Sequence, residues 1–123
     1  MGISHAEHRV TTTKTAAYQV RDSDLGVQFD TYGASGSVTF TLPNTATIVD
    51  GWWCEFYQAA DQNMVIASYG SSDDIVTKND LAADSITFST ATELIGNNVE
   101  VVWNGTVWLA KIQAEETVTA TIG

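Results

Sequence analysis

The hydrophobic pattern of this chain has a period of two over most of its length, and this period constrains the fold more than any other feature. It is clearest where Val38, Phe40 and Leu42 are separated by threonines. Successive side chains of a β-strand point to opposite sides, so such alternation is typical of a strand with one buried face. Pro43 cannot donate a hydrogen bond to a neighbouring strand, so we expect it to end this one.

The same pattern predicts about eight to ten short strands separated by turn signals. They are expected at residues 18–20, 27–29, 38–42, 52–57, 63–69, 73–77, 84–89, 99–103, 107–112 and 117–122. The strongest hairpin signal is Asn104-Gly105-Thr106, which lies between two apolar runs. This spacing of strands and turns is typical of sandwiches and barrels. We therefore predict an all-β fold, an antiparallel β-sandwich of jelly-roll type.

The length of 123 residues predicts one domain, and a content of 44% hydrophobic and 16% charged residues favours a globular chain over a disordered one. Residues 1–15 are polar and lack a sustained period, so we expect an extended N-terminal arm followed by a single domain over residues 16–123. Cys54 is the only cysteine, which excludes an intrachain disulfide. Its apolar neighbours favour a buried small residue over a nucleophile.

The charge is strongly acidic and unevenly distributed. The formal net charge is -10, which argues against nucleic acid as a partner, and no apolar run suggests a signal peptide or membrane span. The first 21 residues hold Arg9, Lys14 and Arg21 against Glu7 alone. This bias is either chance or the mark of an arm that lies on an acidic neighbouring subunit.

The late hairpin is apolar on both sides, which is unusual for a small antiparallel sandwich. Trp53 and Tyr57 also alternate out of phase with Trp52. Either long loops cover this outer surface or another subunit does, and large apolar surfaces usually mark interfaces. The predicted subunit interface comprises Trp53, Tyr57, Val102, Trp108 and Ile112.

No pattern in the sequence supports catalysis, a cofactor or a metal site, so we do not expect an enzyme. The two histidines, His5 and His8, both fall in the predicted arm, where no third ligand accompanies them. Asp22-Ser23-Asp24 lacks the rest of a calcium-binding loop, and turn formation explains its acids. Trp53 is the one tryptophan free for a surface role, either stacking on a sugar or anchoring an interface.

The first third of the chain resembles a segment of small virion proteins of tailed bacteriophages. The resemblance rests on residues 14–18 (KTAAY), on 33–43 (GASGSVTFTLP), and more diffusely on 51–57 and 104–108. It implies a small β-sandwich, often assembled as a trimer, of the kind found in head decoration (cement) proteins and in fibre proteins.

The resemblance implies a structural protein of the virion. The first expectation is a capsid decoration protein, a homotrimer on the outer surface of the capsid that contacts the major capsid protein. In that case the contact with the shell would come from the arm, through His5, His8, Arg9 and Lys14. The alternative is a tail-fibre, head-fibre or receptor-binding module that recognises a host-surface glycan or protein through loops such as 70–74 or 92–98. A lyase or hydrolase is a weaker third hypothesis, because the body of the chain has no histidine.

Overall fold

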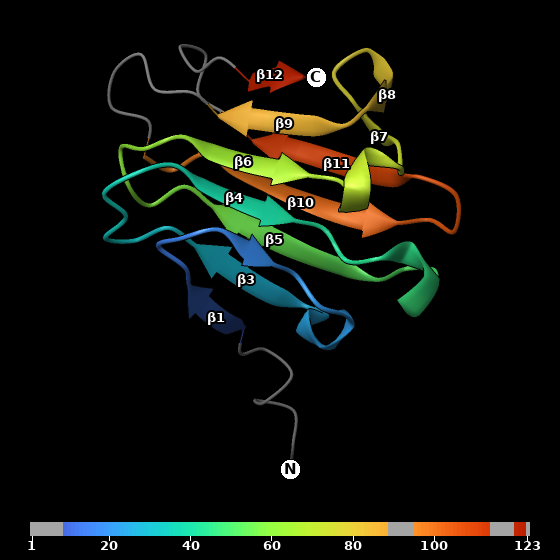
Figure 1. Ribbon diagram of the computed structural model, residues 1–123, viewed down its shortest axis with the longest axis horizontal. Helices are drawn as coiled ribbons and strands as arrows, with labels where there is room; N and C mark the ends of the chain where they lie inside the picture. Colours follow the sequence, from blue (N-terminus) through green and yellow to red (C-terminus); the bar gives the residue numbers. More distant parts are fainter. Residues whose placement is uncertain (1–8, 89–94, 114–119, 123) are drawn as a thin grey trace.

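The computed structural model describes residues 9–88, 95–113 and 120–122 (Figure 1). These residues form twelve strands and three short 3₁₀ helices, with no α-helix among them. The strands are β1 (Val10–Thr13), β2 (Tyr18–Gln19), β3 (Val27–Asp30), β4 (Val38–Thr41), β5 (Trp53–Tyr57), β6 (Met64–Ala67), β7 (Ile75–Thr77), β8 (Asp80–Ala83), β9 (Ser85–Phe88), β10 (Asn98–Trp103), β11 (Trp108–Gln113) and β12 (Ala120–Ile122). The helices are η1 (Asp22–Asp24), η2 (Thr45–Thr47) and η3 (Tyr69–Ser71). The all-β prediction is confirmed, and each of the ten predicted strands is present.

The strands form two sheets that overlap as two layers in Figure 1. Sheet A has seven strands in the order β1-β3-β5-β10-β11-β7-β8, and sheet B has five in the order β12-β9-β6-β4-β2. Both sheets are mixed. The β1–β3, β3–β5, β7–β11, β2–β4 and β4–β6 pairs are parallel, and the other pairs are antiparallel. The prediction of purely antiparallel sheets is therefore wrong, and the jelly-roll topology is not confirmed.

Four of the five parallel pairs, all except β7–β11, follow from the path of the chain between the sheets. From β1 to β6 the strands belong alternately to sheet A and sheet B. Each connection reverses the direction of the chain and also crosses to the other sheet. Every second strand therefore runs in the same direction and becomes a parallel neighbour, as β3 and β5 do in sheet A. A turn that crosses between sheets has the same local sequence signals as a hairpin turn, which is why the pattern alone suggested hairpins.

Strand β1 occupies four residues, 10–13, of the predicted N-terminal arm. It runs parallel to β3, with Val10 opposite Val27 and Thr13 opposite Asp30. The backbone N–H of Lys14 extends this pairing by donating to the carbonyl oxygen of Asp30 (2.9 Å). The extended arm predicted over residues 1–15 is therefore wrong for 10–13, while 1–8 lie outside the described residues. The strand lies at a sheet edge and buries no side chain, so it shows no alternation of apolar and polar residues.

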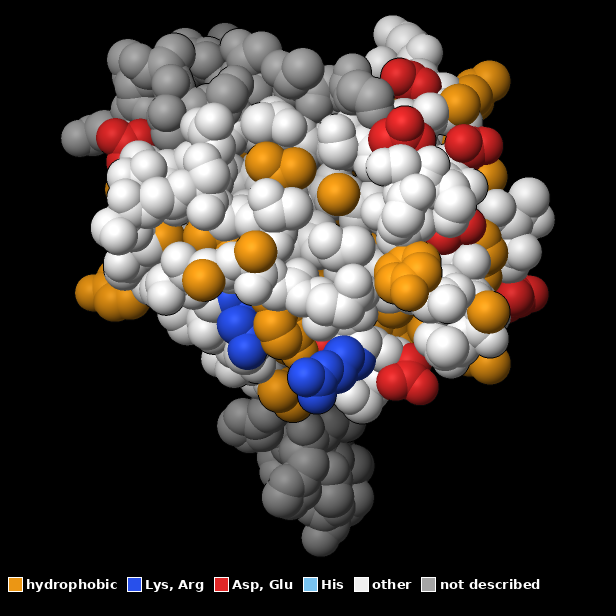
Figure 2. Space-filling view, in the orientation of Figure 1, with side chains coloured by type: hydrophobic (Ala, Val, Ile, Leu, Met, Phe, Trp, Pro, Cys, Tyr) orange, Lys and Arg blue, Asp and Glu red, His pale blue; other side chains and the backbone are white. Residues whose placement is uncertain are grey.

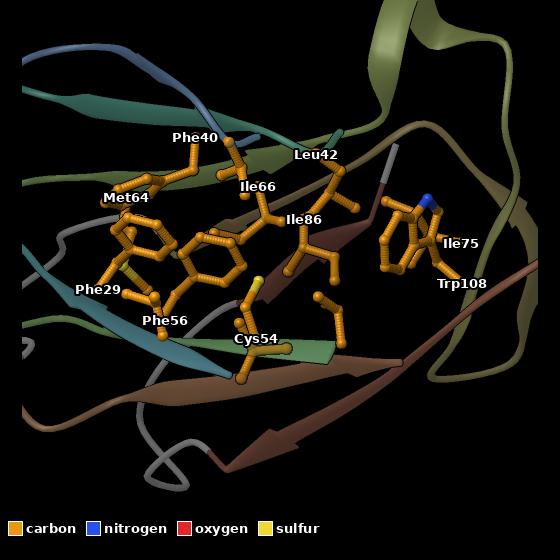
Figure 3. Close-up of a cluster of buried hydrophobic side chains, with 14 of the residues drawn as sticks. Phe29, Phe40, Leu42, Cys54, Phe56, Met64, Ile66, Ile75, Ile86 and Trp108 are labelled. Atoms are coloured by element: carbon orange, nitrogen blue, oxygen red, sulfur yellow. The ribbon is translucent and has the colours of Figure 1, made fainter. Parts of the chain in front are cut away.

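The core lies between the two sheets and joins them through aromatic contacts (Figure 3). Phe40 of sheet B packs against Phe29 and Phe56 of sheet A, with ring centroids 5.5 Å and 4.8 Å away. All three rings are fully buried. Burying one such side chain contributes about 1.5–3 kcal/mol, so this cluster is a main reason why the sheets stay together.

A second aromatic cluster fills the other end of the core. The ring centroids of Trp52 and Trp108 lie 5.8 Å apart in an edge-to-face arrangement, and those of Trp103 and Trp108 lie 5.4 Å apart. The indole N–H of Trp52 donates to the carbonyl oxygen of Asp22 (2.9 Å), which connects this cluster to helix η1. Figure 3 shows Trp108 beside Ile75, away from the phenylalanine cluster.

Candidate functional site

The outer face of sheet A has a row of apolar side chains that crosses four neighbouring strands. Trp53 of β5 pairs with Val102 of β10, Val102 pairs with Leu109 of β11, and Leu109 pairs with Val76 of β7. Paired residues share a face of the sheet, and their inward neighbours Cys54 and Val101 are fully buried, so the row points away from the core. We call Trp53, Val76, Val102 and Leu109 the apolar row.

The apolar row is partly open to solvent and is held in place by the sheet. Leu109 is 38% exposed, and the other three side chains are half-buried. The indole of Trp53 lies over Gly26, where an added Cβ would come within 3.6 Å of Trp53 Cζ2. Gly26 has a φ of +76° and donates its backbone N–H to the carbonyl oxygen of Trp53 (2.8 Å). A residue with a side chain would be strained at this φ, so the backbone conformation that donates to Trp53 favours glycine.

The hairpin between β10 and β11 shows that two of the predicted interface residues, Trp108 and Ile112, face the core. Trp103 lies opposite Trp108, so the connection comprises residues 104–107 instead of the predicted 104–106. Asn104 Oδ1 fixes this longer turn by accepting hydrogen bonds from the backbone N–H groups of residues 106 (2.9 Å) and 107 (2.8 Å). One extra residue moves the whole second strand to the opposite phase. Trp108 is therefore fully buried and Ile112 packs against the core, so neither belongs to the outer face.

A row of charges lies beside the apolar row on the same face. Glu55 of β5 and Glu100 of β10 lie directly opposite each other, an arrangement of like charges that destabilises a sheet. Each has its own cation: Arg9 forms an ion pair with Glu55, and Lys111 approaches Glu100 at 3.5 Å. The two pairs therefore reduce the repulsion between the carboxylates.

The cations predicted to contact a capsid lie against the body of their own chain. Arg9 is paired with Glu55, and Nζ of Lys14 lies 4.0 Å from the ring centroid of Tyr18. Arg9 nevertheless remains exposed to solvent, and Lys14 is half-buried. His5 and His8 lie outside the described residues.

Tyr57 lies on the predicted outer face but at the other end of strand β5 from Trp53. It pairs with Asp30 on one side and with Asn98 on the other, and it is 38% exposed. Polar neighbours therefore surround Tyr57. The apolar row and Tyr57 are separate features of one face.

The outer face of sheet B differs from that of sheet A. Its strands present short uncharged side chains of intermediate exposure: Thr39, Thr41, Val65, Ala67, Ser85 and Thr87. In Figure 2, which views the molecule from the side of this sheet, most of the surface is neither charged nor strongly hydrophobic, and basic side chains gather only near its lower edge. No described outward residue of these strands is charged.

The cysteine and the acidic turn residue Asp24, which were considered as candidate reactive groups, are buried or hydrogen-bonded within the fold. Cys54 is completely buried, as predicted, and burial raises the pKa of its thiol well above the usual range. Asp24 accepts hydrogen bonds from the backbone N–H of Arg21 and from the hydroxyl of Tyr18, both at 2.9 Å. Burial and the bond to Asp24 raise the pKa of Tyr18. These contacts give the acids of η1 a role in the turn.

Two absences hold for the described residues, 9–88, 95–113 and 120–122. Over these residues no group of three or more His, Cys, Asp or Glu side chains could hold a metal ion. None of the helices in the described part of the chain is long and apolar enough to cross a membrane.

Comparisons with known proteins identify no family. A scan against models of known protein families found no match, and a search of curated protein sequences found no significant match.

The structure shows two parts of the site that the sequence did not predict. Leu109 is not among the predicted interface residues, and Val76 is not connected to the hairpin in the sequence analysis. The register of β10 with β11 brings Leu109 outward, and the parallel pairing of β7 with β11 adds Val76. No local signal in the sequence indicates that parallel pairing, because residues 76 and 109 are distant in the chain.

Proposed function

We propose that this chain is a bacteriophage capsid decoration protein, a small β-sandwich that assembles as a trimer through the apolar row of sheet A. The observation that carries the proposal is the apolar row itself, a contiguous set of outward hydrophobic side chains on a domain that already has a complete core. Contiguous apolar surface of this kind favours burial against another protein.

The charge of the chain favours the apolar row as the place where copies meet. Each copy has a formal net charge of -10, so two copies repel each other over most of their surfaces. The apolar row has no charge, and Trp53 supplies a large, well-held ring of the type that anchors interfaces. Association there buries hydrophobic area where electrostatic repulsion is smallest.

The contact with the major capsid protein is assigned to the N-terminal segment. The basic character of this segment comes from His5, His8, Arg9 and Lys14. While they contact their own domain, Arg9 remains exposed and Lys14 is half-buried. A trimer that binds only the mature, expanded lattice stabilises that lattice by mass action. The mechanism is structural and needs no catalytic step, cofactor, nucleic acid or membrane.

This function is tested by counting the copies of the chain in each virion. Quantitative mass spectrometry of purified phage particles, with the major capsid protein as internal reference, gives this number directly. We expect hundreds of copies on the outer surface of each capsid. About a dozen copies would instead identify the fibre or receptor-binding module, and absence from the particle would exclude both.

A further inference from the structure

A polar hollow lies on the outer face of sheet A, at the end of β5 opposite to the apolar row. It has a volume of about 350 Å³ and is lined by Thr13, Gln28, Asp30, Tyr32, Tyr57 and Ala59. A neighbouring hollow of about 290 Å³ shares Gln28 and Tyr57 and adds Arg9, Glu55, Phe56 and Asn98. The volume of the first hollow is at the lower end of the range for ligand sites, and this hollow is wide open to solvent, so it would cover one side of a small ligand.

Two exposed aromatic rings border this hollow. Tyr32 is 74% exposed and Tyr57 is 38% exposed, and neither belongs to the core. An exposed aromatic ring offers a flat apolar face beside a hydroxyl, which suits ligands that have both apolar and polar sides. The C–H face of a pyranose ring stacks on such a surface, and its hydroxyl groups remain free for hydrogen bonds.

The carboxylate of Asp30, which lines the hollow, is held in a fixed position. It accepts hydrogen bonds from Thr13 Oγ1 (2.9 and 3.1 Å) and from the backbone N–H of Tyr32 (3.0 Å). These bonds also fix the start of the turn that carries Tyr32. A carboxylate has about four acceptor sites, so Asp30 keeps capacity for ligand hydroxyl groups.

Other polar groups of the hollow have unused hydrogen-bonding capacity. Among the described residues, no hydrogen bond occupies the side-chain amide of Gln28 or the hydroxyl groups of Tyr32 and Tyr57. An amide both donates and accepts, as a sugar hydroxyl does. The hollow therefore combines aromatic faces with planar polar groups, a combination that matches a saccharide.

The charges around the hollow indicate a neutral ligand. Asp30 is its one charged lining residue, and in the neighbouring hollow Arg9 is already paired with Glu55. An anionic sugar would meet the carboxylate of Asp30 without a free cation, in a chain whose net charge is -10. We propose that this hollow binds a neutral saccharide, which stacks on Tyr32 and Tyr57 and bonds to Asp30 and Gln28. The inference goes beyond the decoration function and does not depend on it.

Binding to the full chain is tested first with maltose, lactose and cellobiose as probes. Saturation-transfer NMR detects weak binding of these sugars, and an array of neutral and acidic glycans widens the search. We expect at least one neutral saccharide to bind. Absence of any neutral binder, or binding of acidic glycans alone, would overturn the proposal.

Two variants then locate the binding site. Tyr32→Ala should weaken the affinity for the bound sugar at least about tenfold, because it removes one stacking face. Gln28→Ala should weaken it by a smaller factor. The matched control is Tyr69→Ala, which removes a tyrosine that is 41% exposed and lines a different hollow. Equal affinity of wild type and Tyr32→Ala would overturn the assignment of the site.

Discussion

The outer faces of sheets A and B are built on the same alternation of residues but have different side chains. Sheet B presents short uncharged residues such as Thr39 and Thr87, whereas sheet A presents the apolar row, two ion pairs and the polar hollows. The inward halves of both sheets are alike, because both must fill one core. The inward positions of both sheets therefore specify the fold, whereas specific contacts are concentrated at the outward positions of sheet A.

The largest expected effect comes from the core that both faces share. Phe40→Ala removes the ring that joins sheet B to Phe29 and Phe56 of sheet A, and it leaves a cavity. We expect the free energy of unfolding to fall by about 3–5 kcal/mol. Urea denaturation measures this loss. Thr39→Ala, on the outward side of the same strand, is the control and should cost less than about 1 kcal/mol. Similar losses for the two variants would contradict the claim that inward positions contribute more to stability than outward ones.

The next effect concerns the apolar row. Leu109→Asp places a charge in the proposed contact between copies, so the trimer should dissociate with a constant at least about thirtyfold higher, which corresponds to about 2 kcal/mol. Leu81→Asp is the matched control, because Leu81 is an even more exposed leucine that lies outside the row. Sedimentation equilibrium measures both constants. If both substitutions had the same effect, net charge and not the row would govern association.

A smaller effect is expected at the charged row of sheet A. Arg9→Ala leaves Glu55 opposite Glu100 without its cation, so stability should fall by about 1 kcal/mol at low salt. The loss should shrink in high salt, because ions screen the repulsion between the two carboxylates. Urea titrations at two salt concentrations measure it. A loss that does not change with salt would mean that Arg9 acts through packing.

The smallest effect concerns Tyr18, which connects sheet B to Phe29 of sheet A. Its folded-state pKa is raised, so its contribution to stability is present below the ordinary tyrosine pKa of about 10 and is lost as pH rises through the raised value. Tyr18→Phe keeps the ring and removes the hydroxyl. Wild type should therefore lose more stability than the variant between about pH 9 and about pH 11.5. Denaturation curves at both pH values measure this difference, and identical losses would contradict the role of the hydroxyl.

The strands themselves were predictable from the sequence because most of them bury one face. Val38 and Phe40, for example, point inward, and their threonine neighbours point outward. Two strands, β1 and β8, are exceptions. Strand β1 was missed because none of its side chains is buried, and β8 was missed because it buries only Ala83.

The topology could not be predicted, because turn residues do not reveal which sheet the next strand joins. The glycine-containing loop between β3 and β4 resembles a hairpin turn but crosses from sheet A to sheet B. The prediction of the candidate site also failed at a turn, because the length of the turn decides which side chains of the next strand face outward. Trp53, Tyr57 and Val102 were correctly predicted to point outward, but one additional turn residue moved Trp108 to the core and Leu109 to the surface.

The most direct test of the apolar row is the mass of the unmodified chain in solution. Sedimentation velocity over a range of concentrations should give three times the chain mass of 13.2 kDa, with more trimer at higher salt because the repulsion between acidic copies is then screened. A monomer at every concentration and salt would contradict the proposal, because the row would then be exposed apolar surface with no second copy to cover it.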